Sequence, residues 1–145
     1  MAELVAVPAA RLALLEAWTL EAEARDWLDG DWDCLMAPCH WALTLTGTDP
    51  AAPWRGRYHS SEAALANLAA GGGMTRLVDR TLRPLGWTRT ADPQPGAFGV
   101  ITMAEAGRTR FGAVRYGDGW SMATRDGQLF TQGRARGCWN PPPGY

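Results

Sequence analysis

The sequence predicts an α+β fold, in which N-terminal helices pack on a small C-terminal antiparallel sheet or barrel. Up to Gly86, apolar residues recur every three to four positions, which is typical of amphipathic helices. After Gly86, short alternating runs stand between glycines and Asp-Gly pairs, which is typical of strands joined by hairpins. The 145 residues suit one domain. Residues 1–86 are expected to be mainly helical, 87–139 to form antiparallel strands, and 140–145 to be a proline-rich tail.

The first two helices are predicted on either side of a turn at Asp29-Gly30-Asp31. One helical face of the first helix, residues 9–25, carries four apolar residues: Leu12, Leu15, Trp18 and Ala22. The second helix ends at Gly47, which is followed by Asp49-Pro50. A start at Asp33 would place Pro38 inside the helix, where it removes a backbone hydrogen bond. The second helix therefore starts later, near Ala37, or is kinked.

Two further helices precede the strands. The third is expected from Glu62 to Ala70, with Ser60 or Ser61 as its cap and glycines at its end. The fourth is expected from Thr75 to about Arg83, because Pro84 and Gly86 follow.

Four strands are predicted after Gly86: Phe98 to Met103, Arg110 to Tyr116, Trp120 to Thr124 and Gln128 to Gln132. Gly117-Asp118-Gly119 and Asp126-Gly127 are expected to be hairpin turns, since such turns demand positive φ.

Charge and hydropathy exclude several classes of partner. The formal net charge is −1, and all 14 basic residues are arginines. This balance predicts neither nucleic acid nor a membrane surface as a partner. No apolar run approaches the ~20 residues of a membrane helix, so no membrane insertion is expected. Residues 1–8 lack a basic, apolar leader, so we expect no signal peptide and synthesis in the cytoplasm.

No metal and no cofactor are predicted. Three cysteines, Cys34, Cys39 and Cys138, are too few and too irregular for a zinc site or a disulfide framework. Alternating aspartates at positions 29, 31 and 33 do not match a calcium loop, because the sixth and twelfth positions hold cysteine and histidine. These aspartates are interpreted as turn and capping residues.

Asp33-Cys34 opens the second helical segment, and a helix N-terminus stabilises the thiolate of a nucleophilic cysteine. Together with five other stretches, it resembles the NlpC-type branch of papain-like cysteine peptidases. The resemblance is nearest to small proteins of phage, prophage and gene-transfer-agent tail clusters. The stretches are Trp32-Asp33-Cys34, Leu45-Thr46-Gly47-Thr48-Asp49-Pro50, Trp54-Arg55-Gly56-Arg57-Tyr58, Pro95-Gly96, Phe111-Gly112-Ala113-Val114 and Cys138-Trp139.

The resemblance implies a papain-like fold with Cys34 as the nucleophile, an acidic residue after Gly96 and a histidine base before Phe111-Gly112. This chain has Ala97 at the first of these positions and Arg110 at the second. Because arginine is always protonated, Arg110 cannot accept a proton from a thiol. Cys34 is therefore interpreted as a vestigial nucleophile.

Two histidines remain as alternative bases. His40 lies six residues after Cys34, which on a helix turns it away from the thiol. His59 lies in a loop whose distance from Cys34 the sequence does not define. A surface or capping role is the simpler interpretation of both.

The sequence predicts a catalytically inactive structural or assembly component of a phage or phage-like tail tip. Its partners would be other tail or assembly proteins, and its location the virion tail. The alternative is an active cysteine peptidase or amidase that cleaves peptidoglycan peptides during genome entry. A third interpretation is an unrelated α+β domain with an accidental likeness.

Overall fold

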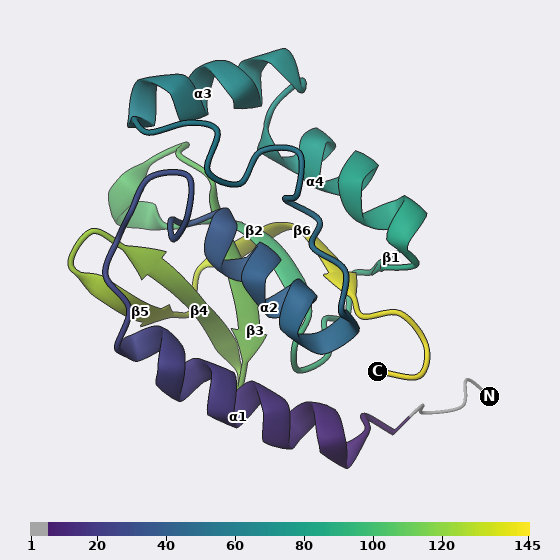
Figure 1. Ribbon diagram of the computed structural model, residues 1–145. Helices are drawn as coiled ribbons and strands as arrows, with labels where there is room; N and C mark the ends of the chain where they lie inside the picture. Colours follow the sequence, from purple (N-terminus) through teal and green to yellow (C-terminus); the bar gives the residue numbers. More distant parts are fainter. Residues whose placement is uncertain (1–5) are drawn as a thin grey trace.

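The chain places its helices before its strands, as the colours of Figure 1 show. The computed structural model describes residues 6–145, so the expected lack of a leader falls mostly outside the described residues. The helices are α1 (Ala9–Glu23), α2 (Met36–Thr46), α3 (Ser61–Ala70) and α4 (Met74–Leu82). A 3₁₀ turn, η1 (Arg83–Leu85), follows α4.

The strands form one antiparallel sheet of six, in the order β1-β6-β2-β3-β4-β5. They are β1 (Thr88–Arg89), β2 (Phe98–Thr102), β3 (Phe111–Tyr116), β4 (Gly119–Thr124), β5 (Gly127–Thr131) and β6 (Arg134–Asn140). A second 3₁₀ turn, η2 (Ala104–Ala106), links β2 to β3. The predicted α+β class is confirmed, and β1 and β5 form the two edges of the sheet.

Most predicted elements are confirmed to within a few residues, and the hairpin glycines Gly117 and Gly127 have positive φ. Ser60 caps α3, because its hydroxyl accepts a hydrogen bond from the Ala63 amide. Two strands were missed: the two-residue β1 and β6, which pairs with both β1 and β2. The sequence of β6, RARGCWN, has no alternation of apolar and polar residues that runs along the whole strand, so only its pairing with distant strands identifies it.

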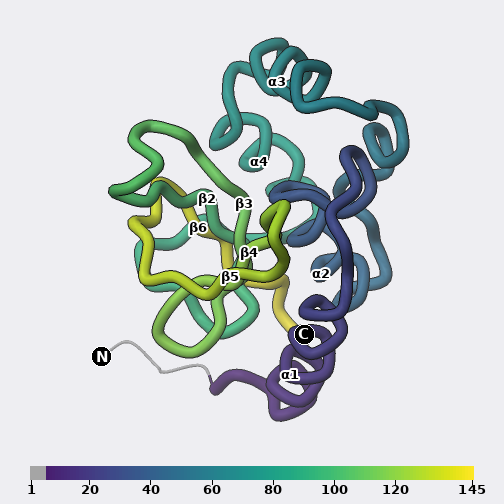
Figure 2. Tube along the Cα trace, turned by 90° about the vertical axis from the view of Figure 1, so that its left-hand side faces the viewer, coloured from purple at the N-terminus to yellow at the C-terminus, as the bar shows by residue number. Residues whose placement is uncertain are grey.

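The helices form one layer against one face of the sheet (Figure 2). α2 packs on β3 and β4, α1 lies along α2 and β5, and α4 packs on β6. α3 contacts α4 on the outside of this layer. Within residues 6–145, no helix has both the length and the apolar character that crossing a membrane requires.

Two apolar clusters form the core, one on each face of the sheet. The larger joins the helices to the sheet and contains the fully buried Met36, Trp41 and Trp139. The smaller, on the other face, contains Ile101, Ala113, Trp120, Met122 and Cys138. Large aromatic side chains supply much of this buried area.

The buried face of α1 differs from the prediction at one position. Leu12 was expected to be buried, but it is 45% exposed, while Arg11 is only 5% exposed. Arg11 continues the buried stripe four residues before Leu15, and its guanidinium binds chain oxygens rather than solvent. It donates to Gln94 Oε1 at 3.0 Å, to the Pro95 carbonyl at 3.3 Å and to the Tyr145 main-chain oxygen.

The proline-rich tail packs on the domain. Asn140 belongs to β6, so the tail begins at Pro141 rather than at residue 140. Pro141 and Pro142 are buried, and Arg11 holds Tyr145 against α1. The tail therefore contacts the domain through Pro141, Pro142 and the main chain of Tyr145.

Candidate functional site

Cys34 lies in a turn directly before α2. The helix begins at Met36, so the later of the two predicted starts is confirmed. Pro38 then falls in the first helical turn, where a backbone N–H has no partner within the helix and proline is tolerated. The proline that conflicted with a helix from Asp33 therefore fits this later start without a kink.

Asp33 holds the turn around Cys34 together. Its carboxylate accepts hydrogen bonds from the Gly30, Leu35 and Met36 amides at 2.8–3.0 Å and from the Tyr58 hydroxyl. The residue is 5% exposed. The turn role predicted for Asp33 is confirmed, whereas the residue at the N-cap position of α2 is Leu35. The carboxylate oxygens of Asp33 are fully committed to the fold, so Asp33 is not free to orient a catalytic base.

The start of strand β3 packs directly against this turn. A side chain at Gly112 would overlap the Cys34 carbonyl and would come within 3.1 Å of the Pro38 ring. Glycine at this position therefore permits the close approach of β3 to the start of α2.

The Cys34 thiol is protonated at neutral pH. Burial raises the pKa of the Cys34 thiol from near 9 to about 11, and the Asp33 carboxylate adds to the rise. A hydrogen bond with the Gly112 backbone only partly offsets this rise. A reactive cysteine needs a lowered pKa, so this environment has the opposite effect.

Arg110 lies immediately before β3, and its guanidinium donates a hydrogen bond to Thr75 Oγ1 on α4. Within residues 6–145 no ion pair or hydrogen bond joins Arg110 to Cys34. The structure therefore ties the two predicted site residues to different helices, α2 and α4.

Neither histidine is hydrogen-bonded to Cys34. His59 is exposed between the buried Tyr58 and the α3 cap, and it makes no hydrogen bond with the described residues. His40 Nδ1 accepts a hydrogen bond from Trp18 Nε1 at 3.0 Å, and its ring packs against Trp32. Burial, helped by two nearby arginines, lowers the pKa of His40.

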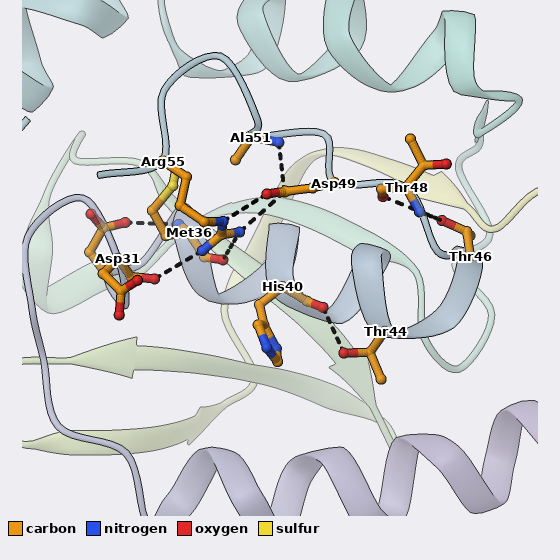
Figure 3. A network of polar contacts seen from close by, with 10 residues as sticks. Asp31, Met36, His40, Thr44, Thr46, Thr48, Asp49, Ala51 and Arg55 are labelled. Atoms are coloured by element: carbon orange, nitrogen blue, oxygen red, sulfur yellow. Dashed lines mark hydrogen bonds and ion pairs between the residues drawn. The ribbon is translucent and has the colours of Figure 1, made fainter. Parts of the chain in front are cut away.

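An ion pair that the sequence did not reveal lies within the loop that follows α2, and its arginine also bonds to the loop that precedes α2 (Figure 3). Arg55 donates to both carboxylate oxygens of Asp49 at 2.8 and 3.2 Å, to the Asp31 carbonyl at 3.0 Å and to the Met36 carbonyl at 3.4 Å. Although burial opposes it, the hydrogen bonds from Arg55 and Ala51 hold the pKa of Asp49 below its usual value. Both residues lie in stretches that carry the resemblance, and here they stabilise the loops around α2.

Gly96-Ala97, where the resemblance implies an acid, forms a turn over Trp41. The Trp41 indole donates to the Gly96 carbonyl at 2.8 Å, and Gly96 has a φ of +86°. Ala97 is buried. This turn therefore offers a packed backbone in place of a carboxylate.

No three His, Cys, Asp or Glu side chains gather to form a metal site within the described part of the chain. Asp29, one of the three alternating aspartates, instead accepts a hydrogen bond from Trp27 Nε1 at 2.9 Å.

Comparison with known proteins identifies a family but no activity. Neither the curated proteins nor the solved structures contain a significant match. A family model described as a domain of unknown function (DUF6950) matches residues 9–140, which is nearly the whole chain. The chain therefore belongs to the DUF6950 family.

Proposed function

We propose that the protein is a catalytically inactive interaction component of a phage or phage-like tail tip, built on a degenerate papain-like, NlpC-type scaffold. The main support for a loss of activity is the environment of Cys34. Its thiol contacts the Gly112 backbone rather than an imidazole, and its pKa is raised to about 11.

Proton transfer is the step that this environment fails to support. At neutral pH, a thiol with such a pKa is ionised in roughly one molecule in ten thousand. Arg110 is permanently charged and cannot take up the proton. The Nδ1 lone pair of His40 is already engaged by Trp18. None of these groups supplies the base that nucleophilic catalysis by cysteine requires.

The papain-like scaffold is supported by the order of the elements and by one contact. A cysteine stands before a helix whose start packs on an antiparallel strand at a glycine. This is the arrangement that the resemblance implies. The location in a tail rests on the resemblance alone, so it needs a direct test.

Alkylation of Cys34 measures the state of the thiol. We expect its rate with iodoacetamide, followed by peptide mass spectrometry, to rise about tenfold per pH unit up to about pH 10. Cys39 is the internal control, because it is buried and should react only if the protein unfolds. A rate that levels off near pH 7 would reveal an activated thiolate and contradict the proposal.

Activity and assembly are tested with Cys34→Ala. We expect wild type and variant to release equal, background amounts of muropeptide from purified peptidoglycan. In the phage or prophage that encodes the chain, deletion of the gene should abolish infectious particles, and the Cys34→Ala gene should restore them. Release that disappears in the variant would establish the peptidase alternative. Normal particles without the gene would refute the tail role.

A further inference from the structure

We infer that a cleft at the start of α4 binds the carboxylates of an acidic segment of a partner protein. The cleft has a volume of about 530 Å³ and lies between α4, β1 and the start of β3. Three arginines line it: Arg76 of α4, Arg89 of β1 and Arg110, which immediately precedes β3. This site is separate from Cys34, which does not line the cleft.

The positive charge in the cleft is only partly balanced from within. In the part of the chain that the structure describes, none of the three arginines forms an ion pair. The one carboxylate in the lining, Asp79, is already bound by Arg83 at 3.0 Å and by the Trp139 indole at 2.9 Å. Three guanidinium groups are therefore available to an external anion, although the protein as a whole carries a net charge of −1.

Two of the arginines are held in place before any ligand binds. Arg110 donates a hydrogen bond to Thr75, and the Arg89 guanidinium lies 5.4 Å from the centre of the Trp139 ring. Thr75, which holds Arg110, and Arg89 both lie near Gly137 of β6, where an added Cβ would lie 3.2 Å from Thr75 and 3.4 Å from Arg89. Groups that are ordered in advance lose less entropy when a ligand binds.

The first turn of α4 also attracts negatively charged groups to the cleft. Gly73 precedes this helix, and no side chain caps it. Unpaired N–H groups at a helix start favour negative charge. Planar guanidinium groups bind carboxylates through two parallel hydrogen bonds. The N–H groups of α4 and the guanidinium groups together therefore favour binding of an acidic side chain.

The size of the cleft favours a peptide over a single small anion. Its volume lies in the range of sites that hold ligands of many atoms, and one inorganic phosphate would leave most of it empty. The edge strand β1 borders the cleft and contributes Arg89 to it. Charge complementarity thus points to an extended acidic segment. Binding of an acidic segment in this cleft does not depend on whether Cys34 is reactive. It is therefore expected even if the protein is an active peptidase.

The test is binding of a fluorescent peptide of alternating glutamate and serine to the full chain at low salt. We expect saturable binding that the glutamine version of the peptide does not show. The cleft variant Arg76→Gln, Arg89→Gln, Arg110→Gln should weaken binding roughly tenfold, since each exposed ion pair contributes up to about 1 kcal/mol. All three side chains are exposed, so the variant should fold, which circular dichroism checks.

A matched variant controls for net charge. Arg57→Gln, Arg108→Gln, Arg134→Gln removes three other exposed arginines outside the cleft, and it should change the affinity less than about twofold. Equal losses in the two variants, or no binding by the wild type, would overturn the inference. If inorganic phosphate binds the cleft more tightly than the peptide does, the site is a phosphate site and the acidic-segment assignment is wrong.

Discussion

Asp33→Ala is expected to lower the free energy of unfolding by about 3 kcal/mol. The carboxylate is buried and accepts hydrogen bonds from three backbone amides and from the Tyr58 hydroxyl. Alanine leaves these donors without partners in a site that is closed to water. Unpaired buried donors cost more than the net contribution of the hydrogen bonds they lose. Urea unfolding followed by circular dichroism measures the change.

Asp31→Ala is the matched control for this experiment. Asp31 lies two residues earlier and is exposed, and Arg55 binds its main-chain carbonyl rather than its carboxylate. Its removal should change stability by less than about 0.5 kcal/mol. If Asp33→Ala were as stable as Asp31→Ala, the carboxylate would not hold the turn before α2, and the account of the Cys34 environment would fail.

Trp41→Ala should cost about 3–5 kcal/mol of stability, the largest effect that we expect from one substitution. The side chain is completely buried, and its ring centre lies 5.7 Å from that of Trp18. It also donates a hydrogen bond to the Gly96 carbonyl. The substitution leaves a cavity between α1, α2 and the Gly96 turn, and urea unfolding again measures the loss.

Two further substitutions separate packing from hydrogen bonding at this site. Trp41→Phe retains much of the ring but removes the donor to Gly96, so it should cost about 1–2 kcal/mol. Leu20→Ala, on the 68% exposed Leu20 of α1, should cost less than about 0.5 kcal/mol. A loss below about 1 kcal/mol for Trp41→Ala would show that Trp41 does not join the helices to the sheet.

Local features of the chain predicted most of the fold. Helix ends followed from Gly47, Pro84 and the Ser60 cap, because these residues act on their own backbone. Hairpins followed from glycines that adopt positive φ. β1 was missed because it has only two residues. β6 was missed because its apolar and polar residues do not alternate along its whole length, and its pairing partners β1 and β2 lie far away in the sequence.

The candidate site, like the fold, could be predicted from the sequence only in part. The sequence alone predicted that position 110 holds no base, because an arginine is protonated wherever it lies. The partners of the predicted residues could not be predicted. Thr75 on α4 binds Arg110, although 35 residues separate them, and Tyr58 binds Asp33 across 25 residues. No periodicity or spacing along the chain reports such contacts.

By itself, therefore, the sequence determined the α+β class, the order of helices and strands, and the lack of a proton acceptor at position 110. These depend on residue type and on interactions between near neighbours in the chain. Only the tertiary structure decided that Arg11 is buried against the tail, that the Cys34 thiol is desolvated, and that three arginines share one cleft. Burial and convergence arise when distant segments pack together, so they exist only in the folded protein.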